Sequence, residues 1–278
     1  MAISVTAAEK KILQNVDIPP RPEALLKVTD EARKPEPDVA IIAKAIASDI
    51  SISAAVLQVV NSAAFRRARE IESIEQAVMI LGLKRVFPIV KAVALKSAMQ
   101  QNPLLDDFWN NANKIAQACA LVAKQLDKPQ LADNAYMLGL FHSAAVPVML
   151  QNYPEYEKVL SKASEDGWDY HIIQMERDFF GTTHTTIGAL LGQQWKLAKD
   201  LVEVIYYQHD ASGIFSSDEL SKVGLWMLAT LKIARHIVLS EFDDGTEWDI
   251  VQDPILEFLE LEDGDLAYIC QQVAAEIA

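Results

Sequence analysis

The sequence has few cysteines and no long apolar run. Its two cysteines, Cys119 and Cys270, lie far apart among 278 residues, so we expect free thiols and a reducing compartment rather than a disulfide-stapled fold. No apolar stretch reaches the roughly 18 uncharged residues of a membrane-spanning helix. The N-terminal residues also lack the basic, apolar and small-residue order of a signal peptide. These absences predict a cytoplasmic protein that does not act in a membrane.

Common catalytic motifs are also missing. The chain contains no glycine-rich phosphate loop, no His-Glu-x-x-His and no Cys-x-x-Cys. Cys119 has no charged neighbour in sequence that would lower its pKa. Ser143 stands beside His142, but neighbours on a helix point about 100° apart, and no glycines form a nucleophile elbow around the serine. The sequence therefore gives no support for a nucleophilic enzyme, and it indicates no cofactor.

Positive charge is scarce, since the formal net charge is −14. Residues 1–105 hold 14 basic and 11 acidic side chains, whereas the remainder holds 11 and 28. This balance excludes a broad surface for nucleic acid, and we expect no DNA binding. A small basic cluster does lie in the first part. It is either a solvated face or a site for an anion or an acidic partner, and it comprises Arg66, Arg67, Arg69, Lys84 and Arg85.

Alternating apolar and polar residues, the pattern of a half-buried strand, are not found in any long run. Apolar residues instead recur at helical spacing throughout. We predict an all-α fold, a helical bundle of about 12–14 helices with no significant sheet. Asp49 and Ser73 are expected N-caps, Gln76 suits a capping box, and Gly82 suits a helix stop.

A boundary is expected near residues 100–106, where "QQNPLLDD" separates two helical groups and the charge balance shifts. We predict an N-terminal helical part over 1–105 and a second helical part over 106–215. A C-terminal extension over 216–278 is expected to pack on the same domain. Its apolar stripe would either return to the core or form a dimer surface, so the chain is expected to be a monomer or a homodimer.

The five histidines show no local chelating pattern. They are His142, His171, His184, His209 and His236. His142 lies in the very apolar "GLFHSAAVPVML" and is either a metal ligand or a core histidine with satisfied hydrogen bonds. His184 follows "GTT" at an expected helix start. His209 precedes Asp210 at an expected helix end, where a protonated imidazole would favour the helix dipole.

Four stretches, read together, resemble one known family. They are "IPPRPEALLKV" (18–28), "PDVAIIAKAIASDISISAAVLQVVNSAAF" (37–65), "IESIEQAVMILGLKRV" (71–86) and "HTTIGALLGQQWKLAKDLVEVIYYQHD" (184–210). Their order and spacing resemble the HDOD domain, a helical bacterial signalling module related to HD-type metal phosphohydrolases. The resemblance covers roughly residues 10–215 and implies an HD-like C-terminal helical half.

The resemblance also assigns a meaning to the histidines. In HD enzymes a His-Asp pair would stand where His142 and Ser143 stand. The pair helps to hold a divalent cation, which lowers the pKa of a bound water. By the same resemblance, Asn111 replaces an upstream histidine, Gln208-His209 replaces a His-His pair, and a late aspartate is replaced near Arg235. A neutral serine is a poor substitute for a bridging carboxylate. At most His142, His184 and His209 would survive from a six-ligand pattern.

These substitutions predict an HD site that is retained in fold and dismantled in chemistry. Its degenerate positions would be Asn111, His142, Ser143, His184, Gln208 and His209, with no catalytic residue and no metal. The resemblance then implies a non-catalytic regulatory module that binds an unidentified signalling protein and, as a further option, an anionic nucleotide. The alternative is a divergent metal-dependent phosphohydrolase.

The loop "NSAAFRRAR" is the expected binding surface for such a partner, through Asn61, Ser62 and the arginines that follow. A structural reading competes with this one. Asn61 could end the preceding helix in a left-handed cap while Ser62 bonds the turn.

Overall fold

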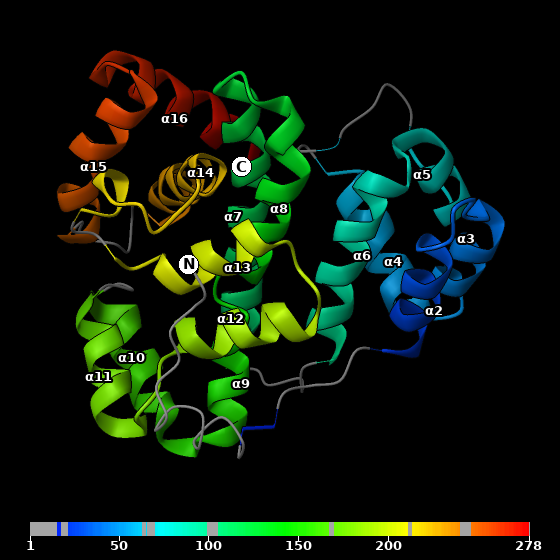
Figure 1. The fold of residues 1–278 in the computed structure, drawn as a ribbon, viewed down its shortest axis with the longest axis horizontal. Helices are drawn as coiled ribbons and strands as arrows, with labels where there is room; N and C mark the ends of the chain where they lie inside the picture. The colour runs from blue at the N-terminus through cyan, green and yellow to red at the C-terminus, as the bar shows by residue number, and fades with distance from the viewer. Residues whose placement is uncertain are drawn as a thin grey trace. The chain divides into compact units, whose positions relative to one another are not determined.

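The fold is entirely helical in the part of the chain that the structure describes (Figure 1). The structure is a computed structural model that describes residues 16–17, 22–62, 65, 70–98, 105–166, 170–210, 213–239 and 246–277. It contains fifteen α-helices over these ranges, slightly more than the expected 12–14. The all-α prediction is confirmed, and the described ranges contain no strand.

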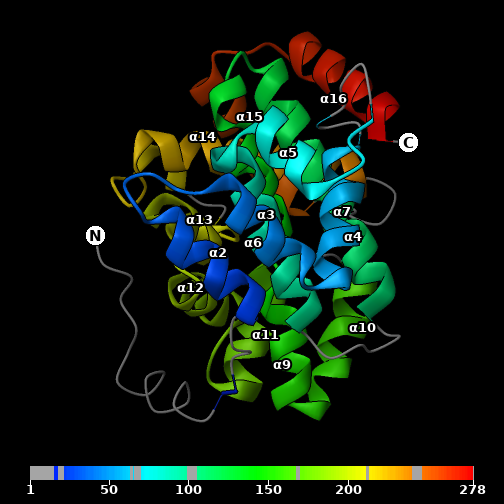
Figure 2. The same cartoon turned by 90° about the vertical axis from the view of Figure 1, so that its right-hand side faces the viewer.

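Two compact units make up the chain. The N-terminal unit, Pro19–Asn102, holds five helices: α2 (Glu23–Ala32), α3 (Val39–Ala47), α4 (Ile50–Val60), α5 (Ile74–Leu81) and α6 (Leu83–Ala98). Figure 2 shows these helices in blue and cyan. They bury an apolar core that includes Leu25, Ile42, Ile46, Ile52 and Ile89.

The second unit, which we call the C-terminal unit, joins Met1–Ile18 to Pro103–Ala278. Its helices are α7 (Asp106–Gln125), α8 (Ala132–Phe141), α9 (Ala145–Asn152), α10 (Glu157–Asp166), α11 (Tyr170–Phe180), α12 (His184–Gln194), α13 (Lys199–Tyr207), α14 (Lys222–Leu239), α15 (Thr246–Leu259) and α16 (Asp263–Ile277). Short 3₁₀ turns lie at Pro129–Leu131, Pro154–Tyr156 and Ile214–Ser216. The subdivisions predicted at 105 and 215 remain predictions.

Helix α7 is central to this second unit, since α8, α14 and α16 all pack against it (Figure 1). The contact between α7 and α8 is very close at Gly139. A Cβ added there would lie 2.6 Å from the Cα of Ala116. Only glycine therefore lets the two backbones meet at this point. The close packing fixes the end of α8, where His142 lies, against the helix that carries Asn111.

Local signals place several helix ends where the sequence predicted them. The side chains of Asp49 and Ser73 accept hydrogen bonds from the backbone N–H of Ile52 and Gln76. Gln76 Oε1 accepts from the backbone N–H of Glu72, so the capping box closes one residue before the N-cap. Gly82 ends α5 with a φ of 77°, a conformation that favours glycine.

The left-handed cap predicted for Asn61 is wrong. Its φ is −96° and its ψ is −2°, in the right-handed region. The side-chain amide instead makes two hydrogen bonds of 2.8 Å to the backbone of Ile71, one donated and one accepted. A long-range bond thus holds Asn61 where a local cap was expected. Ser62 Oγ, expected to bond the turn, is buried and has no partner among the described residues.

The apolar stretch around His142 forms two helices. Helix α8 ends at Phe141, and a turn at 142–144 leads into α9. Pro147 does not cause the break, because it lies in the first turn of α9, where its missing N–H would have no helical partner. The turn places His142 and Ser143 at a helix junction rather than inside a continuous helix.

Both cysteines are free, and Cys119 is buried between helices. Burial raises the pKa of the Cys119 thiol far above its usual range. Within the described ranges, no helix alone has the length and apolar character needed to cross a membrane. Only Val39–Ala47 and Ile52–Val60 taken together reach that length and composition, and they are bent by 115°.

Candidate functional site

A cavity of about 240 Å³ lies where α7, the α8–α9 turn and α14 meet. Asn111 of α7, His142 and Ser143 of the turn, and Arg235 of α14 line it together. His142 and Arg235 are buried, whereas Asn111 and Ser143 are half-buried. Four positions that the resemblance pointed to are therefore brought together in one place, although they come from three separate segments of the chain.

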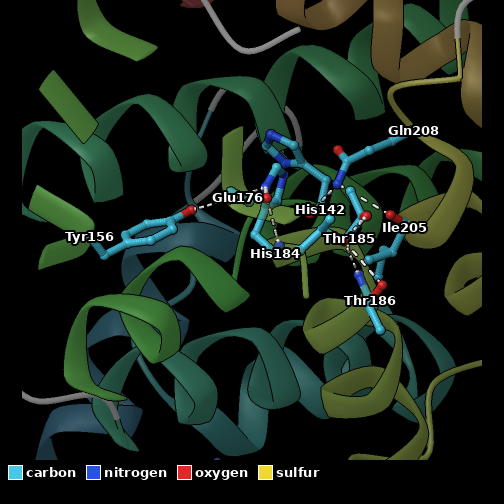
Figure 3. A network of polar contacts seen from close by, with 9 residues as sticks. His142, Tyr156, Glu176, His184, Thr185, Thr186, Ile205 and Gln208 are labelled. Atoms are coloured by element: carbon cyan, nitrogen blue, oxygen red, sulfur yellow. Dashed lines mark hydrogen bonds and ion pairs between the residues drawn. The ribbon is translucent and has the colours of Figure 1, made fainter. Parts of the chain in front are cut away.

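His184 belongs to a fully buried polar triad with Glu176 and Tyr156 (Figure 3). Its Nδ1 lies 2.9 Å from both carboxylate oxygens of Glu176, and its backbone N–H donates to the same carboxylate at 2.9 Å. The hydroxyl of Tyr156 donates to Glu176 Oε1. Burial and the neighbouring carboxylate raise the pKa of Tyr156 well above its usual range, so the hydroxyl stays a donor.

The start of α12 positions this histidine. Thr183 caps the helix, since its hydroxyl accepts from the backbone N–H of Thr186 at 3.1 Å, and His184 is the first helical residue. The predicted helix start before His184 is confirmed. Because the N-terminal N–H groups of a helix lack helical partners, the backbone of His184 is able to bind Glu176 from the neighbouring helix α11.

His209 belongs to a second buried cluster, formed with Glu247, Lys232 and Arg235. Its Nδ1 lies 3.3 Å from Glu247 Oε1. Lys232 Nζ donates to the same oxygen, and Arg235 donates to Oε2 at 3.3 Å. Burial acts to raise the pKa of Glu247, but the combined effect of Lys232, His209 and Arg235 is larger and lowers it below its usual range, so the carboxylate stays ionised.

The predicted role of His209 as a protonated helix-end residue is wrong. Burial lowers its pKa to about 3, against the opposing effect of Glu247, so the ring is neutral at pH 7. The imidazole acts as a hydrogen-bond donor to Glu247 and not as a charge for the helix dipole. Its ring meets that of His184 edge-to-face, with centroids 5.2 Å apart, so the two clusters adjoin.

Gln208 lies beside three buried histidines, His142, His184 and His209, which we call the histidine centre, and it bonds the backbone there. Its Nε2 donates to the backbone oxygen of His142 at 2.6 Å (Figure 3). Its Oε1 is buried and has no hydrogen-bond partner within the described part of the chain. The side chain therefore joins the end of α13 to the α8–α9 turn and holds His142 in place.

All three histidines are held through Nδ1. His142 Nδ1 lies 2.6 Å from the backbone oxygen of Gly139, and the other two bond the carboxylates described above. Burial, followed by Arg235, lowers the pKa of His142 well below its usual range. In the neutral rings of His142 and His209, Nδ1 carries the proton and Nε2 keeps its lone pair. Metal-binding histidines are held in this same tautomer.

The remaining groups fit a divalent metal poorly. Among the residues that the structure describes, no group of three or more His, Cys, Asp or Glu side chains is arranged to hold an ion. Ser143 supplies no charge, and Arg235 lines the cavity beside His142. A guanidinium and a buried ammonium repel a divalent cation strongly where water is excluded.

Acidification is expected to destabilise the fold below about pH 6.5. Unfolded His142 and His209 take up protons near that pH, whereas burial lowers both pKa values in the folded protein, that of His209 to about 3. The unfolded state binds more protons in this window. As the pH is lowered through this window, the free energy of unfolding should therefore fall by up to about 1.4 kcal/mol per pH unit for each histidine. Glu247 acts in the same direction at lower pH.

Urea unfolding at several pH values measures this dependence. His209→Gln keeps a donor for Glu247 and removes the titrating ring, so the slope below pH 6.5 should become shallower. His171→Gln, at an exposed position on α11, is the matched control and should leave the slope unchanged. A His209→Gln slope equal to that of the wild type would contradict this account of the centre.

Sequence reasoning missed the partners of the histidines, namely Tyr156, Glu176, Lys232 and Glu247. A signal for three of them exists in the spacing. Glu176 continues the buried face of Ile172 at i+4, Lys232 follows Leu228 at i+4, and Glu247 precedes Val251 by four residues. A charged residue at apolar-face spacing indicates a buried, paired charge.

The predicted binding surface in the other unit is only partly described. Arg66, Arg67 and Arg69 lie outside the described residues, and so does the side chain of Lys84. The guanidinium carbon of Arg85 lies 5.8 Å from the centre of the Phe65 ring. A cationic group over an aromatic face is a common stabilising contact. The proposal that this cluster binds an anion stays a prediction.

The described residues form an all-helical domain that buries three histidines with their polar partners. Comparison with known proteins gives its family. The family described as the HDOD domain matches residues 18–211. The chain belongs to the HDOD domain family. The resemblance seen in the sequence is confirmed.

Several solved structures are similar to this protein over nearly the whole chain. A candidate phosphohydrolase from Shewanella amazonensis is 28% identical, with a TM-score of 0.71 over 97% of this chain and 94% of that one. An HDOD domain protein of unknown function from Geobacter sulfurreducens is 21% identical, with a TM-score of 0.64 over 98% and 97%. The second likeness shows the fold alone.

Two curated relatives match part of the chain. An uncharacterised protein of Treponema pallidum is 27% identical over 199 residues, which are 70% of this chain and 38% of the relative. The uncharacterised protein YuxH of Bacillus subtilis is 27% identical over 136 residues, 48% of this chain and 33% of the relative. The match thus covers only about a third of the length of each curated relative.

Proposed function

We propose that this chain is a non-catalytic regulatory module of the HDOD type, which acts in signalling by binding a protein partner. The observation that carries the proposal is the pair of buried cations at the histidine centre. Lys232 and Arg235 both contact Glu247, the carboxylate that also bonds His209. By the family resemblance, a phosphohydrolase would hold a divalent ion near these histidines, and the two positive side chains would oppose it.

Exposed apolar side chains in the N-terminal unit support a protein partner. Met79 and Ile80 on α5 are 64% and 55% exposed, and Ile41 on the adjoining helix α3 is 48% exposed. Contiguous exposed apolar patches mark protein-binding surfaces, and these three side chains lie on two helices that pack together. The cytoplasmic setting predicted from the free cysteines is part of the same proposal.

A divergent metal-dependent phosphohydrolase is the second candidate. Two observations favour it: the three histidines are held through Nδ1, as metal ligands are, and the structural relative from Shewanella amazonensis is described as a candidate phosphohydrolase. Against it stand the missing carboxylate at Ser143 and the neighbouring Arg235. We therefore rank it second.

Metal analysis of the purified chain, followed by a phosphodiester hydrolysis assay with manganese, separates the two candidates. We expect less than stoichiometric metal and no turnover above the buffer rate. Ser143→Asp with Arg235→Leu is a useful positive comparison, since it restores the carboxylate and removes the cation. Stoichiometric metal together with turnover by the wild type would overturn the regulatory proposal.

A further inference from the structure

The cavity at the histidine centre has a buried floor and a partly polar rim. His142 and Arg235, both 4% exposed, lie on the floor with Ala112 and Ile115. Asn111 and Ser143 are half-buried and Asp107 is exposed, so these three lie at the rim together with the half-buried apolar residues Phe108, Leu160 and Leu239. The cavity is therefore open to a solute, and its only buried charged lining residue is a cation.

Polar groups of four kinds line this cavity: a guanidinium, a hydroxyl, an amide and an imidazole. Arg235 carries a permanent positive charge and donates to Glu247 through Nη1. The Ser143 hydroxyl and the Asn111 amide add further donors at the rim. His142 Nδ1 donates to the backbone oxygen of Gly139, so only Nε2 can face a ligand, and it does so as an acceptor. A guanidinium with nearby hydroxyl and amide donors suits the oxygens of a phosphate group.

Two carboxylates oppose an anion: Asp107 at the rim, and Glu247, which is paired with both Lys232 and Arg235 behind the floor. The effect of Asp107 is weaker than that of Arg235. Asp107 is exposed and screened by water and salt, whereas Arg235 acts from a buried position where the effective dielectric constant is lower. Glu247 balances one of the two buried cations, Lys232 and Arg235, so the buried cluster keeps one net positive charge. The net field in the cavity should thus favour an anion.

The volume limits what can enter. About 240 Å³ corresponds to roughly eight water molecules at about 30 Å³ each. This is smaller than the roughly 300–1,000 Å³ of sites that enclose a drug-sized ligand. A phosphate group fits inside, while a nucleoside attached to it would remain at the rim.

We infer that this cavity is a binding site for a phosphate group, either free phosphate or the phosphate of a small monoester, held by Arg235, Ser143 and Asn111. The inference rests on the proposed regulatory function and gives its ligand class. A bound phosphate would contact α7, the α8–α9 turn and α14 at once. Its binding would thereby couple three segments of the C-terminal unit.

Calorimetric titration of the full chain tests the site, with EDTA present and in phosphate-free buffer. Inorganic phosphate and adenosine 5′-monophosphate are titrated separately, so that the two arms distinguish free phosphate from a nucleotide monoester. We expect saturable one-to-one binding of at least one probe. Absence of saturable binding by both probes would overturn the inference.

Rim variants locate the binding while leaving the buried ion pairs intact. Ser143→Asp places a carboxylate beside the phosphate and should weaken binding about tenfold or more. Asp107→Asn removes the opposing charge and should strengthen it severalfold. Asp253→Asn makes the same charge change at an exposed position on α15 and should have no effect. Equal affinity in all four proteins would place the binding elsewhere and sink the proposed site.

Failure of this site and failure of the regulatory function are separable. The same samples are assayed with manganese for release of phosphate from the monoester. Release by the wild type would overturn the regulatory proposal while leaving phosphate recognition in the cavity standing. If the samples show no binding and no release, only the phosphate site is overturned, and the regulatory proposal stands.

Discussion

Glu247→Ala is expected to lower the free energy of unfolding by about 3–5 kcal/mol. The carboxylate is 6% exposed and contacts Lys232, Arg235 and His209. Its removal leaves two buried cations without the anion that both contact, and burying charge without that partner is costly. Urea unfolding followed by circular dichroism measures the change.

Matched variants separate this effect from the loss of a side chain on α15. Glu257→Ala, at an exposed position on the same helix, should change stability by less than about 0.5 kcal/mol. Lys232→Met should cost less than Glu247→Ala, because Arg235 and His209 still contact the remaining carboxylate. A loss below about 1 kcal/mol for Glu247→Ala would show that the ionic cluster contributes little to stability.

Glu176→Ala is expected to cost a similar amount, about 3–5 kcal/mol, for a different reason. Three donors would lose their acceptor in a fully buried place: the Tyr156 hydroxyl and both the backbone N–H and Nδ1 of His184. Each unsatisfied buried donor costs about 1–3 kcal/mol. Equilibrium unfolding gives the loss, and proton NMR of His184 Nδ1–H reports whether the histidine remains held.

Two further variants test the origin of that cost. Tyr156→Phe removes one donor and leaves the His184 bonds in place, so it should cost about 1–1.5 kcal/mol. Asp178→Ala, at an exposed position on α11 that accepts from Gln174, should be nearly neutral. If Tyr156→Phe were as damaging as Glu176→Ala, aromatic packing rather than the carboxylate would hold the triad.

The sequence predicts those features of the fold that depend on neighbouring residues. The N-caps at Asp49 and Ser73, the stop at Gly82 and the helix start before His184 each follow from side chains within four residues of the helix end. Asn61 departs from this pattern because its partner, Ile71, lies ten residues away. A bidentate long-range bond outweighed the local preference for a cap.

The candidate site is harder to predict, because its parts come from different helices. The family resemblance grouped Asn111, His142 and Ser143, and these three residues line one cavity. It did not reveal that Glu176 and Glu247 hold His184 and His209, since the partners of a buried histidine depend on tertiary packing. The charge state of His209 was wrong for the same reason: burial, which the sequence shows poorly, lowers its pKa.

The dependence of His209 on Glu247 also concerns where the functional domain ends. The family pattern stops at residue 211, yet the anion and both cations of the second cluster lie at 232, 235 and 247. The final helices are thus not an appendage to a finished domain. Helices α14 and α15 supply these charges, so a substitution there would change the electrostatics around His209 while leaving the residues matched by the family pattern untouched.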